Sequence, residues 1–133
     1  MTLRIAVLVK QVPDIADVRV DEATRHPVIG PSRVLNTYDA YAISEAVSLK
    51  ERAGGDVTVV TAGPSSARDV IVRALATGAD SGVHLDVDDP NAVDTLAMAT
   101  VLTGSLREDE FDIILAGQTT DDYETGQVGL QVA

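Results

Sequence analysis

The sequence contains no cysteine, no tryptophan and a single phenylalanine among its 133 residues. The absence of cysteine excludes disulfide bonds, thiolate metal ligands and cysteine nucleophiles. With almost no aromatic side chains, the core has to be built from valine, isoleucine, leucine and alanine. That composition is typical of a buried parallel sheet covered by alanine-rich helices. Apolar residues make up 45% of the chain, so we expect a folded domain rather than a disordered one.

Positive charge is also scarce, because 10 lysine and arginine residues face 21 acidic ones and leave a net charge of −11. Such a chain offers no cationic surface to nucleic-acid phosphates or to an anionic membrane. Its apolar runs are too short to span a membrane or to form the core of a signal peptide. We therefore expect no nucleic-acid partner and no direct membrane insertion, and a cytoplasmic protein, or one of the mitochondrial matrix if it is eukaryotic.

Apolar runs alternate with helically spaced segments along most of the chain. We expect strands at residues 3–9, 56–62, 81–85 and 111–116, and helices at 38–52, 66–77 and 90–106. A strand–helix alternation predicts right-handed crossovers and a parallel sheet. The predicted fold is therefore a single α/β domain over residues 1–133, with a Rossmann-like parallel sheet in three α/β/α layers. Residues 11–35 are predicted to be irregular, with β-like patches at 18–20 and 28–29, and a stretch of that length is usually functional.

The same spacing predicts how the helices begin and which faces they bury. Thr37 is expected to cap the first helix, and Ser66 with Asp69 forms a capping box at the second. Pro90 is suited to the first turn of the third helix. The side chains expected to point inward are Tyr38, Tyr41, Ala42, Ala46 and Leu49 in the first helix, Val70, Ala74 and Leu75 in the second, and Val93, Leu96, Ala97 and Val101 in the third.

The loop Gly117–Gly129 follows the fourth predicted strand and is the strongest candidate for a binding site. Thr125, Gly126 and Gln127 are expected to open a helix, whose free N–H groups suit a phosphate. The stretches Lys10–Pro13 and Ala62–Pro64 leave the carboxyl ends of two other strands, where ligands bind in such sheets. We therefore predict a nucleotide pocket, although an ordinary strand-to-helix connection would have the same pattern.

Catalytic and metal-binding machinery is not recognisable in the sequence. His26 and His84 are the only imidazoles, and neither belongs to a Ser-His-acid arrangement. The acidic cluster around Asp88 lacks the glycine and the terminal glutamate of a calcium loop. We predict no catalytic residue and no metal ligand.

Five stretches of the chain, in this order and at these spacings, match a known family: Ile5–Asp14, Leu35–Ile43, Gly55–Pro64, Arg73–Asp80, and Leu115–Gly117 with Thr125–Gly129. On these stretches the chain resembles the β subunit of the electron transfer flavoproteins, including the FixA-type proteins. The resemblance implies a fold related to the adenine-nucleotide α-hydrolases and a partner α subunit that holds a redox-active FAD. It also implies AMP in this subunit, or a second FAD in electron-bifurcating members, and electron donation by flavin-dependent dehydrogenases.

The resemblance also implies the nucleotide contacts of this subunit. Main-chain groups of Leu8 and Ala62 would hold the adenine edge, Asn36 would bond the nucleotide, and the Thr125 hydroxyl with the amides of residues 126–128 would clasp phosphate. The complete implied set is Leu8, Asn36, Thr37, Tyr38, Asp39, Ala62, Gly117, Gln118, Thr119, Thr120, Asp121, Asp122, Tyr123, Glu124, Thr125, Gly126, Gln127 and Val128.

The chain departs from the family pattern in charge and in length. Many relatives have a Lys/Arg-Gln-Ala-Ile-Asp run where this chain has residues 118–122, which replaces a cation by Gln118 and adds the carboxylate of Asp121. Repulsion between that carboxylate and a phosphate would cost roughly 1 kcal/mol or more. Family β subunits also continue beyond Ala133, so we expect a truncated N-terminal portion without the loop that engages partner dehydrogenases.

Two other functions remain as alternatives to an electron-carrier subunit without catalytic chemistry of its own. An ATP-cleaving enzyme of the α-hydrolase type requires a glycine- and serine-rich loop after the first strand, and Lys10–Asp14 contains neither residue. A free-standing adenine-nucleotide sensor requires several spaced glycines after the fourth strand, where only Gly117 and Gly126 are available.

Overall fold

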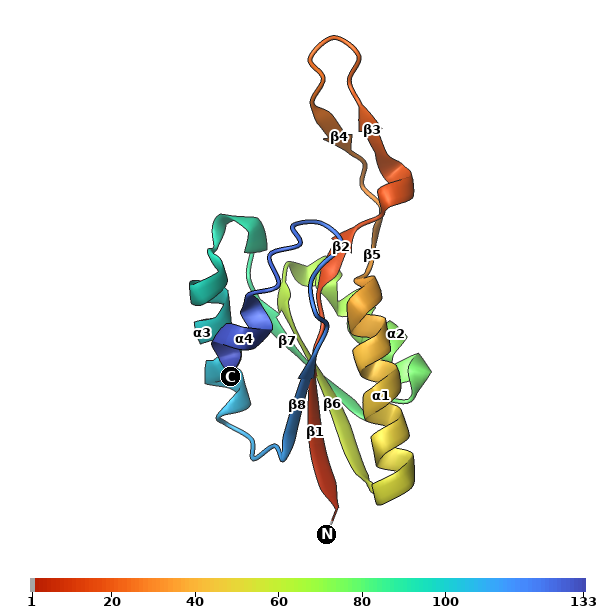
Figure 1. The fold of residues 1–133 in the computed structure, drawn as a ribbon, viewed down its shortest axis with the longest axis vertical. Helices are drawn as coiled ribbons and strands as arrows, with labels where there is room; N and C mark the ends of the chain where they lie inside the picture. The colour runs from red at the N-terminus through yellow and green to blue at the C-terminus, as the bar shows by residue number, and fades with distance from the viewer. Residues whose placement is uncertain (1) are drawn as a thin grey trace.

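The computed structural model describes residues 2–133, in which four parallel strands form the main sheet in the order β7-β6-β1-β8. These strands are β1 (Leu3–Leu8), β6 (Gly55–Gly63), β7 (Ser81–Asp86) and β8 (Ile113–Ala116) (Figure 1). They are the four strands that the apolar runs predict. Strands β7 and β8 lie at the two edges of this sheet.

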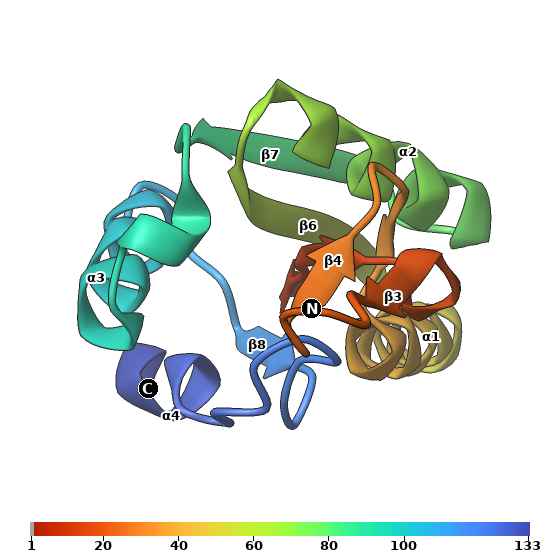
Figure 2. The ribbon, with the colours of Figure 1, turned by 90° about the horizontal axis from the view of Figure 1, so that it is seen from above.

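Helices cover both faces of the sheet. They are α1 (Thr37–Ala53), α2 (Arg68–Thr77), α3 (Thr95–Leu106) and α4 (Val128–Val132). Figure 2 shows α1 and α2 on one side of the strands and α3 and α4 on the other. The predicted Rossmann-like fold in three α/β/α layers is therefore confirmed. None of these helices, within the residues described, has the length and apolar character needed to cross a membrane.

The alternation of side chains along β1 divides the interior into two cores. Ile5 and Val7 point to the core beneath α1 and α2, whereas Ala6 and Leu8 point to the core beneath α3 and α4. Successive residues of a strand face opposite sides, so a strand covered on both faces has to be apolar throughout. The core beneath α3 and α4 is the smaller of the two, with five buried residues against ten.

The strand order reverses beside β1. Strand β6 follows β1 on one side, while β8 pairs with β1 on the other, with Leu8 opposite Ala116. The connections that leave these two neighbouring strands therefore diverge and leave a crevice at their carboxyl ends. Such a topological switch point is where ligands bind in open α/β sheets.

The stretch predicted to be irregular forms a projecting arm in two antiparallel ribbons. Its root pairs β2 (Gln11–Pro13) with β5 (Arg33–Leu35), and its outer part pairs β3 (Val18–Val20) with β4 (Pro27–Ile29). A 3₁₀ turn, η1 (Ile15–Asp17), joins the two parts. The two predicted β-like patches are thus paired with each other, and Figure 1 shows this hairpin standing clear of the sheet.

The predicted buried faces of the helices are partly wrong. In α1 the buried residues are Asp39, Ile43 and Ala46, while Tyr41 is 71% exposed. The carboxylate of Asp39 lies on this buried face beside Ile43 and Ala46, and it accepts a hydrogen bond from the Lys10 N–H at 2.7 Å. Charged residues are rarely buried, so a prediction from hydrophobic spacing does not put Asp39 on the inner face. The predicted inner face of α1 was therefore rotated from the observed one.

Helices α2 and α3 show the same kind of error. Leu75 of α2 and Val101 of α3 are each 41% exposed, and Leu96 of α3 is 63% exposed. The buried residues of α3 are instead Ala99, Leu102 and Leu106. Helix α3 contains no charged residue, so its sequence lacks the charged stripe that would mark the solvent-facing side.

All three predicted helix starts are also wrong in detail. Thr37 is the first residue of α1 rather than its cap, and its N–H donates to Asp121 Oδ2 at 2.8 Å. Ser66 lies in the 3₁₀ turn η2 (Ser65–Ala67) before α2, and its hydroxyl donates to Gln11 Oε1. Pro90 starts the 3₁₀ turn η3 (Pro90–Ala92), whereas the cap of α3 is Asp94, whose Oδ1 accepts from the Ala97 N–H at 2.7 Å. In the first two cases a polar partner distant in the chain takes the place of the expected local bond, and in the third the local cap lies four residues after Pro90.

Candidate functional site

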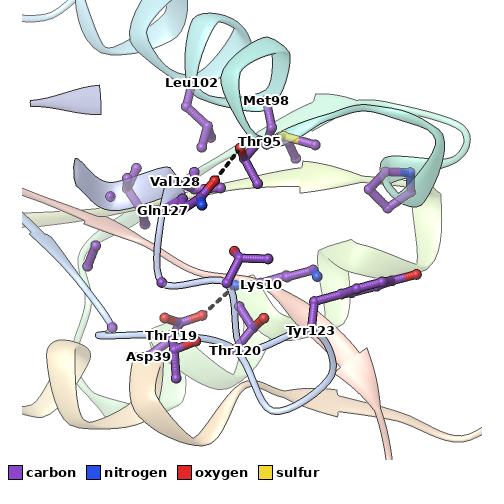
Figure 3. Close-up of a pocket in the computed structure, with 18 of the residues that line it drawn as sticks. Lys10, Asp39, Thr95, Met98, Leu102, Thr119, Thr120, Tyr123, Gln127 and Val128 are labelled. Atoms are coloured by element: carbon purple, nitrogen blue, oxygen red, sulfur yellow. Dashed lines mark hydrogen bonds between the residues drawn. The ribbon is translucent and has the colours of Figure 1, made fainter. Parts of the chain in front are cut away.

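A cavity of about 380 Å³ opens at the carboxyl ends of β1 and β8, at the switch point of the sheet. Three walls enclose it: the end of β1, the loop of residues 117–127, and the segment that leads into α3. Its lining residues are Leu8, Val9, Lys10, Asp39, Ala62, Pro90, Asn91, Val93, Asp94, Thr95, Met98, Leu102, Ala116–Thr120, Tyr123 and Thr125–Gly129. In Figure 3, Met98 and Leu102 of α3 face Asp39 and Thr119 across this space.

Most of the residues implied by the family resemblance meet in this cavity. The twelve that line it are Leu8, Asp39, Ala62, Gly117, Gln118, Thr119, Thr120, Tyr123, Thr125, Gly126, Gln127 and Val128. The other six, Asn36, Thr37, Tyr38, Asp121, Asp122 and Glu124, do not line it. Among these six, Asn36, Asp121 and Asp122 hold the loop of residues 117–127 in place.

Asn36 ties the end of the arm to this loop. Its side chain is completely buried, its Nδ2 donates to the carbonyl of Thr119 at 2.9 Å, and its Oδ1 accepts from the Asp121 N–H at 3.0 Å. Both functions of the amide are therefore used within the protein. Asn36 shapes the cavity wall rather than presenting its side chain to the cavity.

The carboxylates of Asp121 and Asp122 are both satisfied by internal partners. Asp121 accepts from the first N–H of α1, at Thr37, where the positive end of the helix favours a negative charge. Asp122 accepts from Lys10 Nζ at 2.8 and 3.1 Å, and the same ammonium lies 5.2 Å from the ring centre of Tyr123. This ion pair lowers the pKa of Asp122 despite its partial burial, which alone would raise it. The expected repulsion of a phosphate by Asp121 is therefore reduced, since neither carboxylate lines the cavity.

Asp39 joins three segments at the base of the cavity. Besides the bond from Lys10, its Oδ1 lies so close to Gly117 that a Cβ added there would be only 2.4 Å away. Burial raises the pKa of Asp39 to about 6, and the charge of Asp121 adds to the rise, while N–H groups of Lys10 and Gly117 and the side chain of Asn36 oppose it. Burial therefore destabilises the ionised form of this carboxyl relative to the neutral form.

This raised pKa predicts how an Asp39→Asn variant compares with the wild type. A group with a folded pKa above its unfolded value stabilises the protein below the unfolded pKa, and this contribution disappears as pH rises through the folded pKa. The asparagine does not titrate, so we expect the variant to gain about 3 kcal/mol relative to wild type between pH 4 and pH 7. Denaturant unfolding of both proteins across that range measures the difference, and a difference independent of pH would contradict the assignment.

Several polar groups at the cavity have no partner of their own. Thr119 Oγ1 is buried and makes no hydrogen bond to residues 2–133. Within the same described residues, the amides of Gly126, Gln127 and Val128 donate to no protein acceptor either. The helix expected to begin at Thr125 begins instead at Val128 and has five residues. The free N–H groups are therefore those of a loop and a short first turn, and the helix dipole contributes little.

The sequence did not predict the wall formed by η3 and α3. Asn91, Thr95 and Met98 line the cavity, and Thr95 Oγ1 donates to Gln127 Oε1 at 3.1 Å. The order of the strands could have predicted this wall, because the segment that follows β7 also starts at the carboxyl end of a strand of the sheet. The sequence pattern also placed Lys10 near the site but predicted no function for its side chain. Its ion-pair partner, Asp122, is 112 residues away in the chain.

This architecture is that of an α/β protein with a ligand cavity at the switch point of a parallel sheet. A family model described as "Electron transfer flavoprotein domain" matches residues 29–133. The chain is 37% identical over 132 residues to the electron transfer flavoprotein subunit beta of Thermoanaerobacterium thermosaccharolyticum, covering 98% of this chain and 51% of that protein. It is 39% identical over 142 residues to Protein FixA of Azorhizobium caulinodans, covering 98% of this chain and 49% of that protein. The chain therefore belongs to the electron transfer flavoprotein domain family, and the predicted membership is confirmed.

The same identity, 37%, is found with the electron transfer flavoprotein subunit beta of Clostridium acetobutylicum. Here too the match covers 98% of this chain and 51% of the relative. The chain thus spans about half the length of the curated relatives that it matches. The cavity lies wholly within that shared half.

Proposed function

We propose that this chain is the nucleotide-binding part of an electron transfer flavoprotein β subunit. It holds an adenine nucleotide in the cavity at the switch point, and an α subunit supplies the FAD that carries electrons from flavin-dependent dehydrogenases. The chain itself contributes no catalytic residue. The observation that carries the proposal is the cavity, where unbonded polar groups surround an apolar slot in a member of this family.

The apolar slot suits a nucleobase. Leu8 and Ala62 contribute from the sheet, while Val93, Met98 and Leu102 contribute from the segment around α3. Ligand pockets are predominantly apolar with a few placed polar groups that fix orientation. A flat adenine ring between these side chains would leave its edge to main-chain groups at the strand ends.

The polar side of the cavity suits a phosphate. The amides of residues 126–128 have no protein acceptor within the described chain, and the Thr125 hydroxyl lines the same space. Consecutive free N–H groups in a turn form a concave anion site. Lys10 is the only cation among the lining residues described, and its charge is balanced by Asp122, so backbone amides provide most of the attraction.

The size of the cavity favours a mononucleotide. A volume of about 380 Å³ lies near the lower end of the range for small-molecule sites. We therefore propose AMP in this subunit, with FAD as the cofactor of the partner subunit.

Extraction of small molecules from the native complex with its α subunit tests this proposal. We expect AMP by mass identification, at about one molecule per complex, and a visible flavin spectrum corresponding to one FAD. A content of two flavins per complex would indicate that this site holds FAD rather than AMP. A complex that releases no adenine compound would overturn the proposal.

A pair of threonine variants adds a control for the site. Thr119→Val removes a hydroxyl that has no protein partner, so we expect nucleotide retention to fall about tenfold while stability is unchanged or rises. Thr61 also has a buried hydroxyl without a partner, but its place two residues after Val59 in β6 directs it to the core beneath α1 and α2. Thr61→Val should therefore leave retention unchanged.

A further inference from the structure

A buried carboxyl group forms part of the base of the cavity. Asp39 lines this space although it is only 5% exposed, and its Oδ2 accepts from the Lys10 N–H at 2.7 Å (Figure 3). Its Oδ1 lies against Gly117, where an added Cβ would be 2.4 Å away. Gly126 in turn lies against the next residue, Gln118, since a Cβ at Gly126 would be 3.3 Å from the Gln118 carbonyl oxygen. Asp39 is therefore connected to the first of the free amides through the contacts of two residues.

The charges around Asp39 do not compensate its own. The titratable residues that line the cavity or border this carboxyl are Lys10, Tyr38, Asp94, Asp121, Asp122 and Tyr123. The only cation among them, the Lys10 ammonium, is bonded to Asp122 at 2.8 Å. Asp121 adds a negative charge on the side of the loop, and Asp94 adds another where its carboxylate caps α3. An anion that enters this cavity therefore meets the uncompensated charge of Asp39.

Asp39 is also the carboxyl group that is prepared to take up a proton. Burial raises its pKa to about 6, and the charge of Asp121 adds to this rise. Asp122 is partly desolvated as well, but its ion pair with Lys10 holds its pKa below the ordinary value. A neutral carboxyl keeps one oxygen that can accept the Lys10 N–H, so protonation of Asp39 leaves this bond in place. An anion nearby favours the neutral form further, because like charges raise the pKa of a carboxyl group.

We infer that nucleotide binding in this cavity is coupled to the uptake of a proton by Asp39, an inference that rests on the proposed function. The proton comes from solvent and neutralises a charge that would otherwise repel the phosphate. By linkage, the proton and the nucleotide raise the affinity for each other by the same factor. If binding raises the pKa of Asp39 from about 6 to about 7, this factor is about ten. The affinity is then highest below about pH 6, where Asp39 is already neutral, and falls as pH rises through both values.

Titration of the nucleotide-free complex of the full-length protein and its α subunit with AMP tests this coupling. A phosphate monoester itself loses its second proton near about pH 6, so wild type is compared at each pH with Asp39→Asn, whose side chain stays neutral. We expect nearly equal dissociation constants at about pH 5, and a wild-type constant about tenfold higher than that of the variant at about pH 8. Glu45→Gln is the matched control, because it removes an exposed carboxylate from the same helix and should keep the wild-type profile.

Calorimetry provides a readout that a merely structural role of Asp39 would not change. Binding of AMP at about pH 6.5, in buffers of different ionisation enthalpy, gives the number of protons taken up. We expect wild type to take up about half a proton more per AMP than Asp39→Asn. Equal uptake by the two proteins, a ratio of dissociation constants that does not change with pH, or a Glu45→Gln profile like that of Asp39→Asn would overturn the inference and leave the proposed function intact. A complex that binds no AMP would overturn both.

Discussion

Replacement of Asn36 by leucine is expected to abolish nucleotide retention and to lower the free energy of unfolding by about 2–6 kcal/mol. Leucine has a similar size but cannot bond, so the Thr119 carbonyl and the Asp121 N–H lose their buried partner. Each unsatisfied buried group costs about 1–3 kcal/mol. The loop of residues 117–127 would then detach from the start of α1 and open the polar side of the cavity.

Urea unfolding and nucleotide content of the purified complex measure the two effects of Asn36→Leu. Tyr41→Leu is the control, because Tyr41 lies one turn further along α1 with its side chain in solvent. Surface substitutions of this kind change stability by about 0.5 kcal/mol or less. An Asn36→Leu protein that keeps its nucleotide and loses less than about 1 kcal/mol would show that the loop does not depend on this amide.

The substitution Gly117→Ala is expected to destabilise the protein by about 1–3 kcal/mol or more and to weaken nucleotide binding. A Cβ at this position would lie 2.4 Å from Asp39 Oδ1 and 2.9 Å from the backbone carbon of Tyr38. The backbone at the start of α1 cannot move without displacing Asp39 and the bonds that it accepts. Thermal unfolding and nucleotide retention provide the two measurements.

The control for Gly117→Ala is the same change at Gly104, where an added Cβ meets nothing within 4 Å. Gly104 lies inside α3, and alanine in a helix interior is more stable than glycine by about 0.5–1 kcal/mol. The two substitutions should therefore change stability in opposite directions. Equal effects would contradict the close approach of Gly117 to α1.

Strand positions and sheet type were predictable because β-branched runs bounded by glycine and proline are local signals. The same applies to the existence of α1, α2 and α3. Their exact starts were not predictable, since Ser66 bonds to Gln11 and the first N–H of α1 bonds to Asp121. Partners that far away in the chain become neighbours only after folding, so no local pattern records them.

The candidate site was predictable in outline for the same reason. Gly117 and the residues around Thr125 follow a strand, and parallel strands bring their carboxyl ends together. The function of the polar residues was not predictable, because Asn36, Asp121 and Asp122 use their side chains to hold the loop. The wall contributed by Thr95 and Met98 depends on how α3 packs. Because α3 has no charged residue, its sequence does not indicate which side is buried.

The unequal size of the two cores has a consequence for the lifetime of the bound state. The cavity is bounded by α3 and α4, which rest on the smaller core, whereas β1 belongs to both. A ligand that binds only the closed arrangement stabilises this thinner layer by mass action. For the nucleotide proposed above, we therefore expect release to require local opening of the α3–α4 layer rather than global unfolding of the protein.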